Sequence, residues 1–550
     1  MSQSPSLSLT GKRWLLKHAQ KRSIADIVNS LIEERELNRE PLTAIFQDMQ
    51  KSVQRIEDAI RNKEKIAIFG DYDCDGITSS ALLMRYFARR NYDVIVRLPH
   101  RIRDGYGLKE GIIQEFAAQD ISLLITVDTG IGSQKEVALA TTLGIDTIIT
   151  DHHIAPGQLP DAHAILHPGL QTDFPLPHPS GAGVAYCLVS ALENGQWNDR
   201  DTDKTLAMIG TVADVVELRG LNRQIVQEGL RSMRALQTGP LAKLRDTTKA
   251  KTSIDVAFRM APRINAAGRM DDPKTALDAL LHGGDALDVL DVLNTERQEQ
   301  TKELYAEAER NTDLTSPLLW YSDEDLPHGI IGLIAGRLTE RYGKPSCVVT
   351  IDKDVCTASL RSPPCYHITQ GLAHCHDVLS AYGGHAQAAG CSFGADMLDT
   401  VRISLTEHVS SNTSAEDLIP TVHIDAILEP QQISLDLCRA LSVLEPFGQA
   451  NPEPRFLLRG VSCQAQRTVG SDDEHLQCMI DGIKCIGFRL GDLVTHMDED
   501  VDVICRVGID TWNGRIQPQI FIEDMQPTSV RHDEVDNVLN CKTSELLDKS

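Results

Sequence analysis

Short apolar runs alternate with longer amphipathic stretches through residues 66–218. The runs at residues 66–70 and 123–127 are almost continuously apolar and resemble short strands. Residues 79–89 and 134–143 instead space their apolar positions as helices do. Strands that alternate with helices in this way predict βαβ units around a parallel sheet. We therefore expect a first α/β domain over residues 64–272.

The residues before this domain have a helical pattern. Ile24, Ile27 and Leu31 recur at helical spacing, and Pro41 stands where a second helix could begin. We expect residues 1–63 to form an N-terminal helical segment that packs on the first domain.

A long stretch of helix-forming residues follows the first domain. Between residues 273 and 312, glutamates recur at helical spacing on one face, at Glu296, Glu299, Glu303 and Glu307. This pattern predicts a long connecting helix. Strand-like runs then surround a helical stretch at residues 330–341; they lie at residues 318–321, 346–351 and 356–360. They predict a second, smaller α/β domain over residues 313–445.

The C-terminal part changes character after residues 446–454, which are rich in proline, glycine and asparagine and mark a boundary. Beyond them, β-forming residues alternate with the hairpin signals Asp481-Gly482 and Asn513-Gly514. About five strands in this length predict an OB-type β-barrel over residues 455–528, a fold suited to single-stranded nucleic acid. Residues 529–550 are expected to form an acidic tail.

The overall charge is a poor guide to the binding partners. The net charge of −24 argues against nucleic acid, yet basic residues outnumber acidic ones eleven to three between Arg219 and Arg269. Such a segment can contact a polyanion, or it can be a solvated helix face. No run reaches the roughly 18 apolar residues of a membrane-spanning helix, and the 13 cysteines include no Cys-x-x-Cys pair. We expect a cytoplasmic protein with reduced thiols and no membrane contact.

Acidic side chains follow four of the apolar runs. The clusters are Asp71-Tyr72-Asp73-Cys74-Asp75, then Asp128, then Asp151-His152-His153, then Asp214. Carboxylates that meet at the carboxyl edge of one sheet repel each other and need a cation to stay ionised. Oxygen donors with imidazole and no thiolate cluster favour Mg²⁺ or Mn²⁺ over structural zinc. The alternative is that each aspartate only caps a helix or turns a loop.

These clusters resemble a known family. The successive motifs of the DHH phosphoesterase superfamily are matched, in order and approximate spacing, by Asp71-Tyr72-Asp73-Cys74-Asp75-Gly76, Val127-Asp128-Thr129-Gly130, Asp151-His152-His153 and Ala213-Asp214. Three later segments resemble one branch of this superfamily, RecJ, the bacterial single-strand-specific 5′ exonucleases. The segments are Arg263-Ile264-Asn265-Ala266-Ala267-Gly268-Arg269, Ser359-Leu360-Arg361-Ser362 and Gly383-Gly384-His385-Ala386-Gln387-Ala388-Ala389-Gly390. The resemblance implies a DHH domain, a DHH-associated domain and a terminal barrel.

The resemblance also implies a site that holds two Mn²⁺ or Mg²⁺ ions. The metal ligands carry over to Asp73, Asp75, Asp128, His152 and Asp214. Asp128 is expected to bridge the ions, with Asp71 and Asp151 behind the ligands. His153 could orient a ligand, contact the scissile phosphate or assist proton transfer, so Asp128 and His153 are the candidate catalytic residues. Cys74, between two expected ligands, is expected to face the core because alternate residues of an extended segment point to opposite sides.

Directionality requires a second site that recognises the end of the strand. A planar guanidinium binds phosphate in two places at once, and glycines let backbone N–H groups approach it. By resemblance, the 5′-phosphate pocket is formed by Arg101, Arg263, Arg269, Ser359, Arg361, Gly384 and His385. For any single arginine the alternative is a surface ion pair. The segment Gly383-Gly384-His385 could equally be a turn with a buried histidine.

The expected activity is metal-dependent degradation of single-stranded DNA from its 5′ end to mononucleotides, in DNA repair and recombination. The resemblance further implies a monomer that works with a helicase and a single-strand-binding protein. One alternative is a phosphodiesterase that acts on short oligonucleotides or cyclic dinucleotides; the barrel and the basic segment count against it. Another is a catalytically inactive scaffold of the replication machinery, and the complete ligand set counts against that.

Overall fold

The computed structural model describes residues 7–18, 22–37, 46–101, 103–470, 472–496, 500–511 and 515–528. The chain divides into two compact units. Unit 1 comprises Met1–Glu36, Thr413–Glu445 and Pro452–Ser550, and unit 2 comprises Leu37–Asn412 and Pro446–Asn451. The turn expected at Asn513-Gly514 and the tail expected at residues 529–550 lie outside the described residues.

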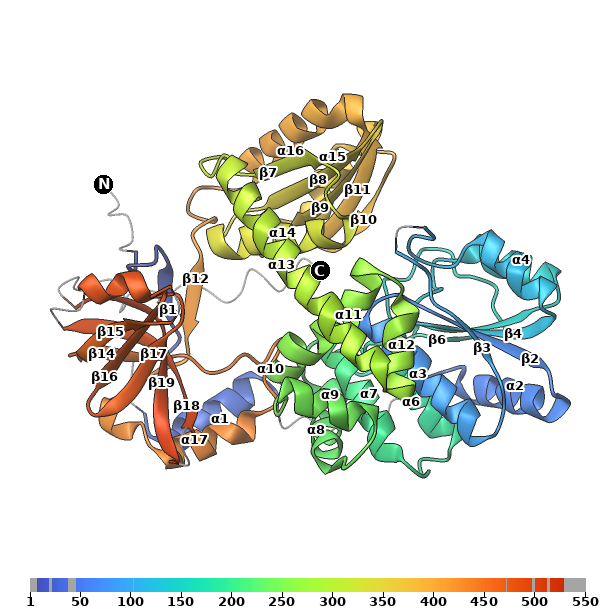
Figure 1. Cartoon of the computed structure of the whole chain (residues 1–550), viewed down its shortest axis with the longest axis horizontal. Coiled ribbons are helices and arrows are strands. Elements are labelled where there is room, and N and C mark those ends of the chain that lie inside the picture. The colour runs from blue at the N-terminus through green and yellow to red at the C-terminus, as the bar shows by residue number, and fades with distance from the viewer. Residues whose placement is uncertain are drawn as a thin grey trace. The chain divides into compact units, whose positions relative to one another are not determined.

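Unit 2 begins with a five-stranded sheet in the order β3-β2-β4-β5-β6, in which all neighbours are parallel (Figure 1). Its strands are β2 (Lys65–Gly70), β3 (Ile95–Arg97), β4 (Ile121–Val127), β5 (Asp146–Thr150) and β6 (Ala164–Leu166). Ile66 and Ile68 enter one hydrophobic core, whereas Ala67 and Phe69 enter another. The sheet is therefore buried on both faces, and the expected parallel α/β domain is confirmed.

Helices cover both faces of this sheet (Figure 1). Phe116 of α4 (Glu110–Ala118) and Ala140 of α5 (Gln134–Thr142) share a core with Phe69. Leu82 of α3 (Cys74–Arg89) and Leu188 of α6 (Gly181–Leu192) pack on the other face. The domain is completed by α2 (Met49–Asn62), α7 (Arg200–Ala213), α8 (Gly220–Ala235), α9 (Pro240–Thr248), α10 (Ser253–Asp255), the π-helical turn η2 (Val256–Met260) and α11 (Ala261–Met270). Within the described ranges, no helix is both long and apolar enough to cross a membrane.

A buried carboxylate fastens α7 to α3. Asp203 of α7 is fully buried and accepts a hydrogen bond from Trp197 Nε1 at 2.7 Å. It also pairs with Arg85 Nε at 2.5 Å and with Arg89 Nη1 at 2.9 Å, both from α3. Because α3 begins beside Asp75 and α7 ends beside Asp214, this contact helps to set the separation of two candidate metal ligands.

The connecting helix starts later than expected. Most of it is α13 (Asp285–Asn311), but residues 273–282 form a separate helix, α12 (Pro273–His282). Gly283 and Gly284 break the helix with φ angles of 69° and 65°, a backbone that glycine adopts without steric penalty. The expectation of one helix over residues 273–312 is corrected in this respect.

The second domain of unit 2 contains a five-stranded sheet in the order β10-β11-β9-β8-β7. Its strands are β7 (Leu319–Glu324), β8 (Ser346–Asp352), β9 (Val355–Arg361), β10 (Ala381–Gly384) and β11 (Ala388–Gly394), and its helices are α14 (His328–Tyr342), α15 (Ile368–His374) and α16 (Leu398–Asn412). Only β7 and β8 are parallel. The expected smaller α/β domain is present, but it ends near residue 412 because residues 413–445 belong to unit 1.

Unit 1 contains a seven-stranded sheet in the order β13-β14-β18-β19-β17-β16-β15. The strands are β13 (Ala426–Ile427), β14 (Phe456–Val461), β15 (Gln464–Val469), β16 (His475–Ile480), β17 (Ile483–Gly487), β18 (Val501–Asp510) and β19 (Gln517–Pro527). The expected hairpin at Asp481-Gly482 is confirmed: both residues have positive φ, as the tight turn between β16 and β17 requires.

The N-terminal residues do not pack as expected. β1 (Arg13–Leu16) is a strand, and it pairs in parallel with β12 (Thr421–Ile424) of the same unit. Trp14 donates to Asp524 Oδ2 at 2.7 Å, and residues up to Glu36, including α1 (Ile24–Glu34), belong to unit 1 together with α17 (Leu435–Leu441). Helical periodicity reveals an apolar face but not the core that receives it, so the assignment of the whole segment to the first domain was wrong.

Removing the buried carboxylate of Asp203 should destabilise unit 2. Asp203→Ala leaves Arg85 and Arg89 without their buried partner, which typically costs about 3–5 kcal/mol. We expect the thermal unfolding midpoint of the variant to fall by several degrees relative to the wild type in calorimetry. The control is Asp288→Asn, which breaks only the exposed pair with Lys243 and should leave the midpoint nearly unchanged. Equal midpoints for Asp203→Ala and the wild type would contradict the anchoring role.

Candidate metal centre and anion pocket

Three strands of the first sheet end in register, and an aspartate follows each of them. The last residues of β2, β4 and β5 pair with one another, and the next residues along the chain are Asp71, Asp128 and Asp151. Their relative exposures are only 5%, 2% and 0%. The carboxyl edge of an open parallel sheet is where ligands bind, so the sheet itself gathers these carboxylates.

Two further aspartates are positioned by helix N-termini. Asp73 caps α3 and accepts from the backbone N–H groups of Asp75 and Gly76 at 2.9 and 3.1 Å. Asp75 accepts three hydrogen bonds from the start of α6: from Ser180 Oγ at 3.1 Å, Gly181 N at 2.7 Å and Ala182 N at 2.9 Å. A Cβ on Gly181 would lie 2.5 Å from Asp128 Oδ1, so only glycine lets α6 approach so closely. Helix N-termini stabilise negative charge, which holds both carboxylates in place.

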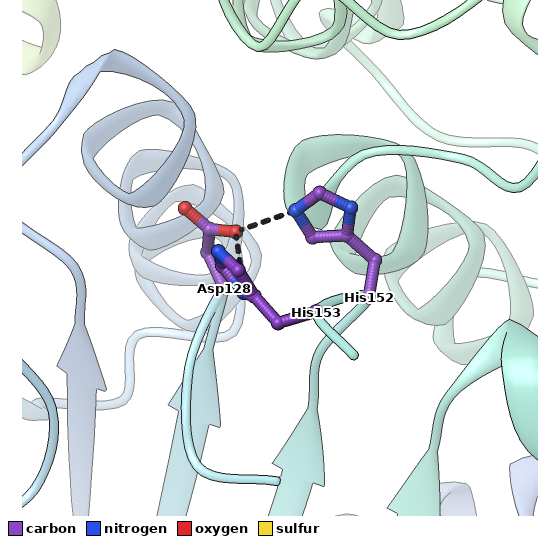
Figure 2. Close-up of side chains that lie close together, drawn as sticks. All are labelled: Asp128, His152 and His153. Atoms are coloured by element: carbon purple, nitrogen blue, oxygen red, sulfur yellow. Dashed lines mark ion pairs between the residues drawn. The ribbon is translucent and has the colours of Figure 1, made fainter. Parts of the chain in front are cut away.

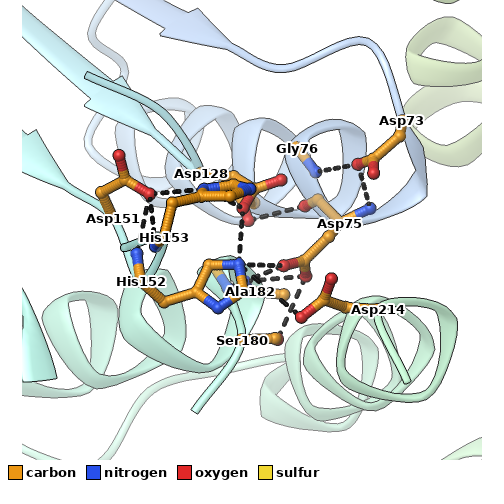
Figure 3. A network of polar contacts seen from close by, with 12 residues as sticks. Asp73, Asp75, Gly76, Asp128, Asp151, His152, His153, Ser180, Ala182 and Asp214 are labelled. Carbon is orange, nitrogen blue, oxygen red and sulfur yellow. Dashed lines mark hydrogen bonds and ion pairs between the residues drawn. The ribbon is translucent and has the colours of Figure 1, made fainter. Parts of the chain in front are cut away.

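His152 faces Asp128 (Figure 2), and a wider view shows that it also faces Asp75 and Asp214 (Figure 3). Its Nε2 lies 3.2 Å from Asp128 Oδ1, 3.6 Å from Asp214 Oδ2 and 3.9 Å from Asp75 Oδ2. Both Nε2 and Asp128 Oδ1 are buried, yet neither has a hydrogen-bond partner, and Asp71 Oδ1 is in the same state. Burial lowers the pKa of His152 to about 3, so the imidazole is neutral and Nε2 can act as an electron-pair donor. Divalent cations bound in this cluster would satisfy these atoms.

His153 is held differently from its neighbour (Figure 3). Its Nδ1 donates to Asp151 Oδ1 at 2.8 Å, and the same oxygen accepts from the backbone N–H groups of His152 and His153. Although burial opposes the charge, the Asp151 hydrogen bond and negative charge raise the pKa of His153 to about 9. The pKa of Asp151 falls to about 2, because these donors and Ile131 N outweigh the effect of burial. Asp151 and His153 therefore form a partly buried ion pair beside the metal ligands.

The remaining carboxylates are destabilised in their ionised form. Burial raises the pKa of Asp71, Asp128 and Asp214 well above the usual value, and the negative charges of neighbouring aspartates, chiefly Asp73 and Asp75, raise it further. The pKa of Asp75 rises to about 7 by burial and by the charge of Asp73, despite the hydrogen bonds from α6. Only a cation in the cluster can keep several of these groups ionised at neutral pH.

Three overlapping groups of side chains could each hold a metal ion. Within each group, the ligand atoms lie within 4.8 Å of one another. The groups are Asp128, His152 and His153; Asp75, His152 and Asp214; and Asp71, Asp73 and Asp128. The structure thus brings together all five residues that the sequence suggested as ligands. It also places Asp71, which was expected behind the ligands, close enough to bind a metal itself. Asp128 and His152 each belong to two groups, so one metal position adjoins the next.

Four arginines, which we call the arginine cluster, lie next to residues 71–75, which we call the metal loop. They are Arg101, Arg269, Arg297 and Arg361. The guanidinium of Arg101 stacks on the ring of Tyr72 at 4.4 Å, and Tyr72 lies between Asp71 and Asp73. Burial and the charges of Arg101, Arg297 and Arg361 lower the pKa of Arg269 to about 9. Burial, and then Arg101, also lowers the pKa of Arg361. Like charges at such close range require an anion, and a phosphate group would supply it.

Two other residues predicted for the 5′-phosphate pocket, Ser359 and Arg263, differ in their contacts. Ser359 Oγ accepts from Arg361 Nη1 at 3.2 Å, so it orients that guanidinium. Arg263 instead pairs with Asp291 of α13 and donates to the carbonyl of Arg259, so the ion-pair alternative holds for it in this structure. Several other basic residues of this segment also serve the fold; Arg245, for example, donates to the carbonyls of Met233 and Leu236 at the end of α8.

Gly384 and His385 line a pocket of about 480 Å³ together with Tyr106, Asp151 and His153. Gly384 has a φ of 138°, and a Cβ there would lie 2.4 Å from the carbonyl oxygen of Ala388. His385 is exposed, which excludes the alternative of a buried histidine. The pocket therefore adjoins the candidate metal centre through His153.

Sequence reasoning missed several residues of the site. Arg297 lies on the connecting helix α13, and its buried Nε has no hydrogen-bond partner. Asn265 of α11 accepts from Cys74 N at 2.9 Å and so anchors the metal loop. No local pattern marks Arg297, but the run Ser180-Gly181-Ala182-Gly183 at the start of α6 was a recognisable helix N-terminus. Cys74 is fully within the core, as expected, and burial raises the pKa of its thiol.

Comparison with known proteins agrees with this geometry. Residues 65–213 match the model of the DHH family, N-terminal domain, and residues 424–524 match that of the RecJ OB domain. The single-stranded-DNA-specific exonuclease RecJ of Bacillus subtilis is 32% identical over 86% of this chain, which spans 63% of that protein. The Salmonella typhimurium RecJ is 32% identical over 87% of this chain and 90% of its own length.

A solved structure shows the same architecture. The crystal structure of RecJ from Thermus thermophilus in complex with Mn²⁺ superposes with a TM-score of 0.82 and 26% identity. The match covers 93% of this chain and 79% of that one. The ordered motifs, the two matched domains and these relatives together show that this chain belongs to the RecJ family of DHH phosphoesterases.

Proposed function

We propose that this chain is a metal-dependent exonuclease that shortens single-stranded DNA from its 5′ end and releases mononucleotides. The observation that carries the proposal is that two clusters of opposite charge, the carboxylates of the metal centre and the arginines around Tyr72, lie on either side of Tyr72. Tyr72 belongs to both clusters: it stands between Asp71 and Asp73 in the chain, and the guanidinium of Arg101 lies 4.4 Å from the centre of its ring. A terminal phosphate bound by the arginines would place the next phosphodiester beside the metals.

The metal centre suits two divalent ions. Asp128 contributes to two of the three groups of ligand atoms, which supports its assignment as the bridging ligand. Mn²⁺ or Mg²⁺ at this centre would activate water and stabilise the charge that develops on the phosphate in hydrolysis. The relatives from Thermus thermophilus were crystallised in complex with Mn²⁺ and with Mg²⁺.

His153 is the candidate for handling the proton. Asp151 keeps its imidazole protonated at neutral pH and fixes the Nδ1–H, which leaves the ring positively charged at the edge of the pocket. We assign to it contact with the scissile phosphate and donation of a proton to the departing 3′ oxygen of the terminal nucleotide. Cleavage there frees a 5′-mononucleotide and leaves a 5′ phosphate on the shortened strand, ready for the next cycle.

The pocket lined by Tyr106 has a size suited to the departing nucleotide. Tyr106 is 47% exposed, and its ring meets those of Tyr72 and His153 edge to face at 6.5 and 5.8 Å. A volume of about 480 Å³ falls in the range of pockets for small ligands. This favours release of single nucleotides over long fragments.

The alternative is a phosphodiesterase for short oligonucleotides or cyclic dinucleotides. A cyclic dinucleotide has no terminal phosphate and would not use the arginine cluster, and a small substrate would not need the OB domain of unit 1. An inactive scaffold would have no use for buried carboxylates that need a cation. Action in DNA repair, partnership with a helicase and a single-strand-binding protein, a cytoplasmic location and a monomeric state remain predictions from the family resemblance.

Loss of the bridging carboxylate should abolish activity. Asp128→Asn removes charge shared by two ligand groups, and we expect kcat on a 5′-phosphorylated single strand to fall by at least about 100-fold. Calorimetric titration with Mn²⁺ should show fewer bound ions than in the wild type, and EDTA should inactivate both. The control is Asp120→Asn, at the opposite edge of the sheet, where the side chain is 86% exposed. A fully active Asp128→Asn variant would refute the metal assignment.

The arginine cluster should determine the choice of strand end. Arg361→Gln removes charge-assisted hydrogen bonds to a terminal phosphate, so we expect KM for a 5′-phosphorylated strand to rise about 10- to 150-fold. KM for the same strand with a 5′ hydroxyl should change little. Arg341→Gln is the matched control, because this arginine is 60% exposed on α14. Equal effects of Arg361→Gln on both substrates would contradict recognition of the 5′ phosphate.

The Asp151–His153 pair predicts a pH dependence of the metal-free protein. A pKa of about 9 for His153 means that its stabilising interaction is complete below pH 6.5 and is lost as the pH rises to 9. The pKa of about 2 for Asp151 means that the same pair also breaks as the pH falls from about 4 to 2. NMR titration of the EDTA-treated protein should show the His153 resonances moving near pH 9.

Asp151→Asn provides the control for this titration. It should return the pKa of His153 toward 6.5, because it removes both the hydrogen bond and the negative charge. Titration of His153 near pH 6.5 in the wild type would show that the ion pair does not form.

A further inference from the structure

Phe258 is unusually exposed for an aromatic residue. Its relative exposure is 74%, the largest among the phenylalanines that the structure describes. Single exposed apolar residues are common and need no explanation by themselves. Phe258, however, lies in the π-helical turn η2, where the N–H of Ala261 bonds to the carbonyl of Val256, five residues earlier. Such turns are rare and frequently occur at functional sites.

Several exposed cations lie close to Phe258 in the sequence. Arg259 is 52% exposed and pairs with Asp255 at 3.2 Å, and Lys249 and Lys251 are exposed just before the helix begins. Arg234 is also exposed and donates to the carbonyl of Lys251, which draws a further cation to this place. An aromatic ring among cations is suited to a single nucleic-acid strand, because the bases stack on the ring while the cations attract the backbone. This chemistry stands out in a protein with a net charge of −24.

The helix that carries Phe258 leads directly to the site. η2 continues into α11, where Asn265 anchors the metal loop through Cys74 N and Arg269 belongs to the arginine cluster. At 1.5 Å per residue, Asn265 and Arg269 lie about 10 and 16 Å along the helix from Phe258. The helix thus holds Phe258 at a fixed distance of a few nucleotides from the place where the strand end would bind.

We propose that Phe258 is a stacking platform for a base of the strand beyond the scissile phosphate. The proposal rests on the proposed nuclease function and deepens it, because it assigns a residue that distinguishes a strand of several nucleotides from a dinucleotide. Stacking on an aromatic ring tolerates every base, so Phe258 would hold the strand without reading its sequence. Phe258 touches no reacting atom and acts as a positioning residue.

The test compares two variants on substrates of different length. Phe258→Ala should raise KM about 5- to 150-fold for a 5′-phosphorylated strand of ten nucleotides, the range expected for loss of one stacked base. KM for a 5′-phosphorylated dinucleotide, and kcat for both substrates, should not change. Phe258→Trp should restore KM, and binding of the strand in EDTA should quench the new tryptophan fluorescence. Leu143→Ala is the control, since this residue is 44% exposed and follows α5 at the opposite edge of the sheet.

A strand with abasic positions separates stacking from other effects. Phe258→Ala and the wild type should bind an abasic strand equally in fluorescence anisotropy, because no base is present to stack. An unchanged KM for the ten-nucleotide strand would overturn the proposal, and so would an equal rise for the dinucleotide. If the wild type cleaves no substrate, the nuclease proposal fails; anisotropy and tryptophan quenching in EDTA then still decide whether Phe258 stacks on bases.

Discussion

The mutual repulsion of buried carboxylates at the carboxyl edge of one sheet is the constraint on which the site depends. In-register strand ends place Asp71, Asp128 and Asp151 side by side, and no choice of rotamer can separate their backbones. Local contacts reduce this repulsion for some of the carboxylates. Asp75 receives the N-terminus of α6, Asp73 caps α3, and Asp151 pairs with His153. What these contacts leave uncompensated, around Asp128 and His152 Nε2, is the place where a cation is required.

The arginine cluster is the complementary half of the same arrangement. Burial and the charge of neighbouring arginines lower the pKa of Arg269 and of Arg361, whereas burial and neighbouring carboxylates raise the pKa of Asp128. The two clusters do not neutralise each other, because Tyr72 and the metal loop stand between them. Each cluster therefore needs its own counterion. A strand with a terminal phosphate, together with bound metal ions, would complete the charge balance of both.

Much of the fold and of the candidate site could be predicted from the sequence, for identifiable reasons. An apolar run followed by aspartate predicts a strand and places the aspartate at the carboxyl edge of the sheet. The tight turn at Asp481-Gly482 could be predicted because it depends only on the two residues that form it. Arg297 could not be predicted as a site residue, because it joins the arginine cluster only when α13 packs beside α11. Arg263 was suggested by its motif, but the same packing supplies Asp291 as its partner. The break at Gly283-Gly284 and the destination of residues 13–36 likewise depend on packing between segments distant in the sequence.

The pairing of β1 with β12 has a consequence for the biosynthesis of the chain. Unit 1 is assembled from segments at the two ends of the sequence, whereas nearly all of unit 2 is continuous between them. Chains emerge from the ribosome N-terminus first, and domains generally fold as units. β1 therefore has no partner strand until β12 has emerged from the ribosome, more than four hundred residues later. Most of unit 2 can fold during this interval, so unit 1 becomes complete only after most of unit 2 has been synthesised.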